Sequence, residues 1–148
     1  MKAVVQRVTS ARVEVADETV GAIDRGLVAF VGAQAGDAET DLDYIARKLP
    51  DLRVFEDERG KMARSVVDAG GGLLVVSQFT LLGDVSKGNR PSFSGAMAPA
   101  EAEAFLVRLV ERLRTKVSRV ETGRFGAEMR VLVDNDGPVT ILLDSRAR

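Results

Sequence analysis

Two short segments without any polar side chain place the strongest constraint on the fold. Gly26–Val31 is one continuous apolar run, and Leu73–Val76 is another. A strand with one face in water alternates apolar and polar residues, whereas an unbroken apolar run is typical of a strand that is covered on both faces. We therefore predict that both segments are buried strands.

Most of the remaining chain also has the pattern of strands. Ala3–Val8 and Ala11–Ala16 are predicted as two strands separated by Thr9-Ser10, because both are rich in valine. Further strands are predicted at Val20–Ile23, Leu52–Phe55, Val117–Val120, Met129–Val133 and Val139–Leu143.

Two helices interrupt the strands. The first is predicted to begin with Asp37 as its N-cap and to end at Pro50, and the second to begin at Pro99. Apolar residues fall at helical spacing in both, at Leu42, Ile45, Ala46 and Leu49 and then at Phe105, Leu106, Leu109, Val110 and Leu113. Residues 79–98 show no clear periodicity and contain several glycines and serines, which indicates a long loop.

The order of these elements indicates an α+β fold. The helices stand between groups of strands without strict alternation, which favours an antiparallel or mixed sheet that curls towards a barrel. No Gly-x-Gly-x-x-Gly follows a strand and no Walker motif is present, so a doubly wound dinucleotide fold is not expected. With 148 residues, of which 45% are apolar, we expect one domain over residues 1–148.

Two missing residue types narrow the chemistry. The chain has no cysteine, which excludes disulfides, thiolate nucleophiles and cysteine-bound metals. It also has no histidine, which excludes Ser-His-Asp and Cys-His catalysis and the usual general base at neutral pH. An enzyme of this composition must use carboxylates, hydroxyls, amines, backbone dipoles or groups of its substrate, and we expect neither metal nor cofactor.

Membrane association is not expected either. Met1–Arg7 becomes polar too early for a signal peptide, and no apolar run approaches the about 20 residues that span a bilayer. The formal net charge of −1 provides no global basic field for nucleic acid. We therefore expect a cytoplasmic protein, in which only a local basic patch could attract RNA.

Ser77-Gln78-Phe79-Thr80-Leu81 is the first segment suited to chemistry. It follows a predicted buried strand and opens the long loop, where hydroxyls and backbone N–H groups often contact ligands. The alternative is that Ser77, Gln78 and Thr80 only satisfy hydrogen bonds at the end of the strand.

Asn135-Asp136-Gly137-Pro138-Val139-Thr140 is the second segment. Asn-Asp-Gly-Pro is a strong turn signal, so taken alone it predicts a hairpin between the last two strands. Its sequence does not by itself predict a cis peptide bond before Pro138.

Charged residues give weaker signals. Lys87, Arg90 and Arg124, together with Arg7, could contact phosphates, although on charge alone a solvated loop is the better explanation for the first two. Scattered acids without metal-ligand spacing are interpreted as turn and surface residues, namely Asp84, Asp134, Asp136 and Asp144.

The two segments together make the chain resemble the D-aminoacyl-tRNA deacylases. The resemblance extends over the whole chain and includes the order of several shorter motifs. These are Lys2–Val8, Gly60-Lys61-Met62, Arg90-Pro91-Ser92-Phe93-Ser94 and Thr122-Gly123-Arg124-Phe125.

The resemblance implies an activity and a set of site residues. Members of this family hydrolyse the ester between a D-amino acid and the terminal adenosine of tRNA, and they also act on mischarged glycyl-tRNA. It implies a homodimer whose active sites lie at the interface, with Ser77, Gln78, Phe79 and Thr80 of one chain facing Gly137 and Pro138 of the other.

Within such a site, each residue has an expected role. The N–H groups of Phe79 and Thr80 would stabilise the oxyanion, and the ribose 2′-OH would help to activate water. Pro138 in the cis form would direct two carbonyl oxygens at the α-amino group and exclude every L side chain. Met129 is expected near the adenosine, and Lys87, Arg90 and Arg124 near phosphates.

Two other classes of protein fit the same residues. One is a module that binds RNA or a nucleotide without catalysis, and the other is a structural dimer whose long loop exchanges between subunits. Deacylation of D-Tyr-tRNA separates an enzyme from both.

Overall fold

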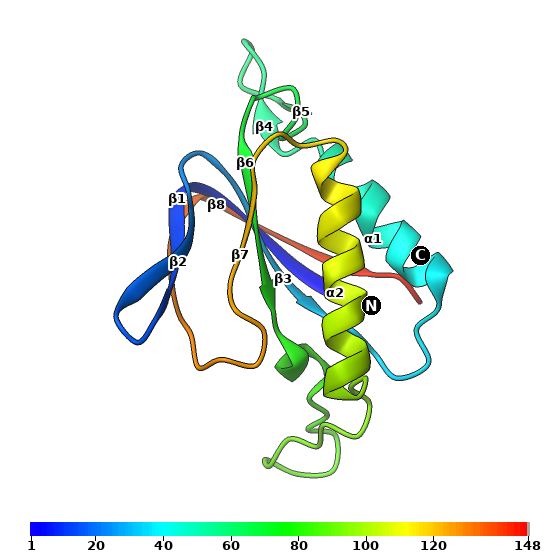
Figure 1. Cartoon of the computed structure of the whole chain (residues 1–148). Helices are drawn as coiled ribbons and strands as arrows, with labels where there is room; N and C mark the ends of the chain where they lie inside the picture. Colours follow the sequence, from blue (N-terminus) through cyan, green and yellow to red (C-terminus); the bar gives the residue numbers. More distant parts are fainter. Residues whose placement is uncertain (148) are drawn as a thin grey trace.

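The computed structural model describes residues 1–147 and has one large curled sheet with two helices beside it (Figure 1). The strands are β1 (Lys2–Val15), β2 (Glu18–Ile23), β3 (Gly26–Gly32), β4 (Phe55–Glu56), β5 (Met62–Arg64), β6 (Gly72–Ser77), β7 (Val120–Thr122) and β8 (Arg130–Asp144). The helices are α1 (Glu39–Asp51), the 3₁₀ turn η1 (Phe79–Leu82) and α2 (Pro99–Arg114). The main sheet has the order β2-β1-β3-β6-β7, β8 pairs with β1, and β4 and β5 form a separate small sheet.

The first strand is longer than the sequence suggested. Ala3–Val8 and Ala11–Ala16 were predicted as two strands, but β1 runs without interruption and pairs with β3 through Lys2–Val8 and with β2 from Ala11 onward. The prediction was wrong because β8 lies along β1 and continues the ladder past Thr9-Ser10, with shifts in register there.

The two apolar segments are buried strands at the centre of the sheet, as predicted. β3 lies between β1, to which it is antiparallel, and β6, to which it is parallel. β7 is parallel to β6 and begins at Val120, where the strand predicted at Val117–Val120 ends. The sheet is therefore mixed, which agrees with the α+β prediction.

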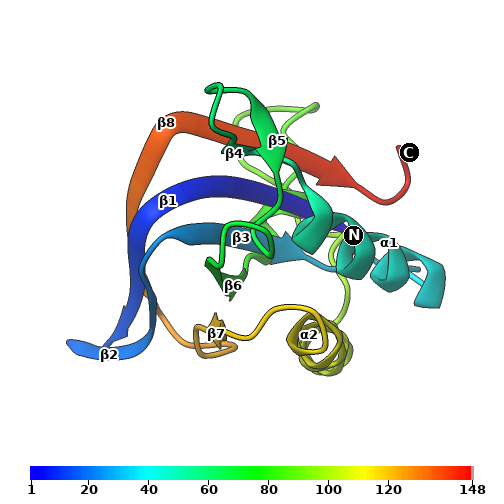
Figure 2. The same ribbon diagram turned by 90° about the horizontal axis from the view of Figure 1, so that it is seen from above.

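The sheet curls until its two ends nearly meet (Figure 2). Gly21 of β2 lies against β7, since a Cβ added to this glycine would lie only 2.2 Å from the carbonyl oxygen of Thr122. The closed side of the curl encloses a smaller apolar cluster made of Val8, Ala11, Val13, Ile23, Val28, Leu74 and Val76.

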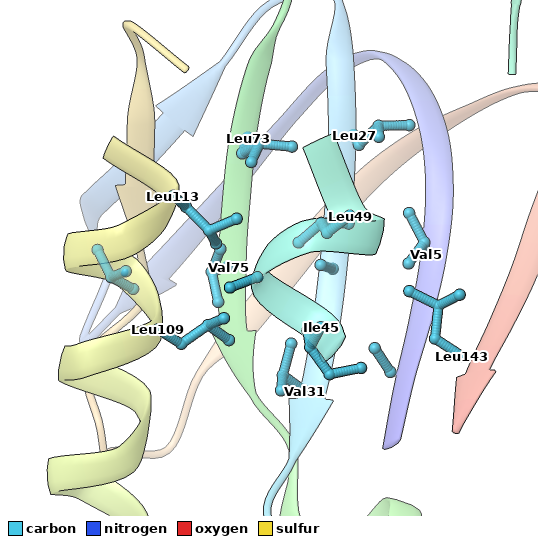
Figure 3. Packing of buried hydrophobic residues seen from close by; sticks show 14 of the residues in the cluster. Val5, Leu27, Val31, Ile45, Leu49, Leu73, Val75, Leu109, Leu113 and Leu143 are labelled. Carbon is cyan, nitrogen blue, oxygen red and sulfur yellow. The ribbon is translucent and has the colours of Figure 1, made fainter. Parts of the chain in front are cut away.

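The main core lies between the other side of the sheet and the two helices (Figure 3). Leu109 and Leu113 of α2 pack near Leu73 and Val75 of β6, while Ile45 of α1 lies near β3. Both predicted apolar stripes are therefore on the sheet-facing sides of their helices. Burial of each such aliphatic side chain contributes about 1.5–3 kcal/mol to the free energy of unfolding.

The start of α1 differs from the prediction. Asp37 is not the N-cap, because Ala38 occupies that position. The Asp37 carboxylate instead accepts a hydrogen bond from the N–H of Gln34 (2.7 Å) and pairs with the amino group of Met1 (2.8 Å). Asp41, one turn into the helix, accepts the hydrogen bond from the N–H of Ala38 (2.8 Å).

The environment of Asp41 predicts a pH-dependent stability. Hydrogen bonds from the N–H of Ala38 and from the Ser145 hydroxyl (2.7 Å) lower the pKa of Asp41. Because the folded pKa is depressed, this contribution is present above the unfolded value of about 3.9 and is lost as pH falls through the folded pKa. Asp41→Asn should lower the free energy of unfolding by about 1 kcal/mol at pH 7.

Urea unfolding of both proteins between pH 7 and pH 3 measures this effect. The difference between wild type and variant should shrink below about pH 4. A difference that stays constant over the whole range would assign the effect to packing and contradict the prediction.

No helix within residues 1–147 is long and apolar enough to cross a membrane.

Candidate functional site

Ser77–Thr80 lies where the central strand β6 ends and the chain turns. The N–H of Gln78 still donates to the carbonyl of Val31 (2.8 Å), and η1 begins at the next residue. Among the described residues, Leu81 is the first of this turn whose N–H has an acceptor, the carbonyl of Gln78 at 3.3 Å. The preceding N–H groups, those of Phe79 and Thr80, are therefore left for another partner, as at the start of any helical turn.

The polar side chains of this turn bond to one another. The Gln78 amide donates to the Thr80 hydroxyl. The Phe79 side chain is 55% exposed, and its ring meets that of Phe93 edge to face at 5.1 Å between centroids. A large aromatic side chain that is this exposed on a rigid turn provides a surface for an apolar or aromatic ligand.

The turn forms one wall of a hollow of about 580 Å³, here called the first hollow. The other walls come from the long loop, the first turns of α2 and the segment before β8. Its lining includes Ser77, Gln78, Phe79, Phe93, Phe125 and Met129. The volume and the mainly apolar lining with a few polar groups are typical of a small-ligand site. The Thr80 side chain is outside the lining.

Gly137 and Pro138 do not form the tip of a hairpin. The hairpin prediction was wrong, because β8 continues through both residues and pairs with β1 before and after them. Gln6 faces Thr140 and Val8 faces Asn135, so residues 136–139 form a bulge with only Arg7 opposite them. Both residues are exposed and their peptide bond is cis, as the resemblance implied.

The Arg7 side chain supports this bulge from the interior of the protein. Its side chain is only 9% exposed, donates to the carbonyl of Val54 (2.7 Å) and lies 3.3 Å from the Asp136 carboxylate. Asn135 fixes the bulge from the other side, because its amide donates to the carbonyls of Arg7 (3.0 Å) and Val139 (3.2 Å). Arg7 is thus an internal support and is not available to phosphate, which corrects its place among the candidate phosphate contacts.

The other basic candidates do not line one common hollow. Lys87 and Arg90 are exposed in the long loop and line neither of the hollows described here. Arg124 lines a second hollow, of about 380 Å³, between α2 and β7. The structure therefore brings Ser77, Gln78, Phe79 and Met129 together, and it does not group the three cations.

The sequence did not single out several residues that line the first hollow. Phe93 and Phe125 lie in motifs that carried the family resemblance, so those motifs held the signal. Met97 and Ala102 of the first hollow have ordinary loop and helix patterns and gave no signal. Within one chain, Gly137 and Pro138 do not line the first hollow.

Comparisons with known proteins agree on one class. A family model described as D-Tyr-tRNA(Tyr) deacylase matches residues 4–144. A D-aminoacyl-tRNA deacylase of Sorangium cellulosum is 59% identical over 147 residues, covering 99% of this chain and 98% of the relative. One of Thermotoga petrophila is 57% identical over 145 residues, covering 98% and 97%.

Solved structures show the same fold. A c-Myc DNA Unwinding Element Binding Protein matches with a TM-score of 0.93 and 47% identity, over 97% of this chain and 98% of its own. A probable eukaryotic D-amino acid tRNA deacylase matches with a TM-score of 0.82 at 20% identity, over 96% and 97%. These matches place the chain among the aminoacyl-tRNA deacylases, a class of hydrolases. It belongs to the D-Tyr-tRNA(Tyr) deacylase family.

Proposed function

We propose that this chain hydrolyses the ester bond of D-aminoacyl-tRNA and of mischarged glycyl-tRNA, releasing free tRNA and the amino acid. Family membership supports the D-aminoacyl reaction, since the family model and the curated relatives carry it in their names. The reaction removes D-amino acids before translation can use them. Because aminoacyl-tRNA is made and used there, we place the enzyme in the cytoplasm.

The observation that carries the proposal is the pair of unpartnered N–H groups beside the first hollow. An aminoacyl ester is already activated, so its hydrolysis mainly requires donors for the oxyanion and a placed water. The N–H groups of Phe79 and Thr80 have no acceptor in the described part of the chain and supply the donors. The ribose 2′-OH next to the ester helps to activate the water, which suits a chain without histidine and cysteine.

We assign the terminal adenosine to the first hollow. Phe79 and Phe93 offer aromatic faces and edges, and Met129 offers a polarisable side chain. The Ser77 to Thr80 turn then lies beside the ester at the ribose.

We also propose that the working enzyme is a homodimer in which each site is shared. One chain supplies the first hollow, and the Gly137-Pro138 bulge, which does not line that hollow in its own chain, comes from the second. Leu142 on the same strand is 76% exposed, and within residues 1–147 β8 pairs only with β1, so this strand offers an unused edge and apolar surface to a partner.

Sedimentation at the concentrations of the activity assay tests the dimer. We expect a species of about 32 kDa, twice the 15.9 kDa chain, as for a two-fold symmetric pair. Leu142→Asp should weaken the dimer and reduce activity in parallel, since a desolvated carboxylate is costly in an interface. A monomer with full activity would refute the shared site.

The bulge is proposed to select the chirality of the substrate. Side-chain pockets discriminate by size and polarity, so they cannot reject every L-amino acid while accepting many D-amino acids. A fixed backbone segment beside the α-carbon can block the one direction in which all L side chains project. Glycine has no side chain and passes, which extends the proposed activity to glycyl-tRNA.

Release of D-tyrosine from D-Tyr-tRNA by the purified protein, compared with hydrolysis in buffer and with L-Tyr-tRNA, tests the function. We expect turnover of the D ester alone. Binding of tRNA without any release above the buffer rate would instead support a binding module, and neither binding nor release would support a structural dimer.

A further inference from the structure

The second hollow directly adjoins the first. Ser77, Leu106 and Phe125 line both, so the two hollows lie side by side at the end of β6 and along α2. Phe125 is the aromatic residue that the two linings share. A ligand seated in the first hollow therefore lies next to the second.

The lining of the second hollow is suited to a nucleotide. Val107 is 52% exposed although it is apolar, and it lies beside Leu106 and Val110 on the same side of α2. These side chains and Phe125 give a surface on which a base can stack. Arg124 lines the hollow, and its guanidinium has no ion-pair or hydrogen-bond partner in the described part of the chain, so it is free to contact a phosphate.

The remaining charges of the hollow also fit this ligand. Arg114, whose guanidinium donates to the carbonyl of Val120 (3.2 Å), adds positive charge at the end of α2. Glu103 and Glu111 lie on the same side of the helix and would repel a phosphate placed next to them. Carboxylates do, however, accept hydrogen bonds from the amino group of cytosine. A cytidine nucleotide offers its phosphate to the arginines and its amino group to the glutamates, so it matches both the positive and the negative side chains of this hollow.

We propose that the second hollow binds the cytidine that precedes the terminal adenosine in the C-C-A end of tRNA. This inference rests on the proposed function, because it requires the adenosine in the first hollow. The base stacks on Phe125 and Val107, and Arg124 contacts the phosphate between cytidine and adenosine. The enzyme thus recognises the acceptor end as at least a dinucleotide.

Two short esters separate this subsite from the adenosine site. The D-tyrosyl ester of adenosine reaches only the first hollow, whereas that of cytidylyl-adenosine reaches both. In the wild-type protein, kcat/KM should be about tenfold higher for the dinucleotide, as expected for one stacked base and one phosphate contact. The quantity compared among variants is the ratio of the two kcat/KM values.

Two variants of the second hollow should bring this ratio close to one. Arg124→Gln removes the phosphate contact, and Val107→Asp places a negative charge on an exposed position where folding is little affected. Lys116→Gln is the matched control, because Lys116 follows α2 but pairs with Asp51 of α1 at 3.8 Å, away from the hollow. This variant should keep the wild-type ratio.

Each result decides the matter. A wild-type ratio near one, with both esters hydrolysed, would overturn the inference and leave the proposed function intact. Variants of the second hollow that keep the wild-type ratio would overturn it as well. Hydrolysis of neither ester would overturn the proposed function and this inference with it.

Discussion

Gly137→Ala is expected to lower kcat/KM for D-aminoacyl-tRNA by about a hundredfold while the protein remains folded, because displacing a positioning group by about 1 Å can have an effect of that size. Gly137 has a φ of +120°, a backbone conformation that residues with a side chain rarely adopt. A Cβ there would lie 2.9 Å from the Val139 side chain and 3.0 Å from the Arg7 guanidinium. The bulge must move, and it carries Pro138 with it.

Gly60→Ala is the matched control for this substitution. Gly60 also has a positive φ, +75°, but a Cβ there meets nothing within 4 Å. It lies in the turn between β4 and β5, so it carries the same kind of backbone strain without any effect on the bulge. Circular dichroism and steady-state kinetics on D-Tyr-tRNA and L-Tyr-tRNA measure folding, rate and selectivity.

Arg7→Lys adds a second test of the same bulge. Lysine keeps the charge near Asp136 but loses the planar donor group that reaches the carbonyl of Val54. We expect a smaller loss of activity in the same direction and increased hydrolysis of the L ester. If both Gly137→Ala and Arg7→Lys left rate and selectivity unchanged, the bulge would have no role in the site.

A substrate that ends in 2′-deoxyadenosine is expected to react about a hundredfold more slowly than the natural one, the lower end of what a general base contributes. The chain has no histidine or cysteine, and within residues 1–147 neither the Ser77 nor the Thr80 hydroxyl is hydrogen-bonded to a carboxylate. The 2′-OH of the substrate is then the group nearest to the ester that can assist the water. Single-turnover rates with both substrates measure the difference.

Ser77→Ala and Thr80→Ala are the complementary variants. Both keep the backbone N–H groups of the turn, so they should retain activity within about tenfold of the wild type. A covalent aminoacyl enzyme trapped on Thr80 and detected by mass spectrometry would contradict this mechanism. Equal rates for the two substrates would contradict it too.

The sequence alone determined the features that depend on local pattern. Gly26–Val31 and Leu73–Val76 are buried central strands, and Pro99 begins the second helix, because apolar periodicity directly reports which faces leave water. The absence of histidine and cysteine narrowed the possible chemistry, because a residue type that the chain lacks cannot act as nucleophile, base or metal ligand. Residues Ser77–Thr80 became a candidate site because a polar turn follows a buried strand, and their role stays a prediction.

The tertiary structure decided everything that depends on partners far along the chain. Turn chemistry predicted a hairpin at Gly137-Pro138, but β1 pairs with β8 on both sides of it, and a long ladder of hydrogen bonds outweighs a local turn preference. Arg7 was grouped with the cations that could contact phosphates, yet its partners are Val54 and Asp136, which are 47 and more residues away. Asp37 was predicted as a helix cap, but its carboxylate instead contacts the amino group of Met1 and the N–H of Gln34. A local sequence pattern indicates which residues are buried and which element they favour. Hydrogen-bonding and charged partners far apart in the sequence are brought together only by the folded sheet.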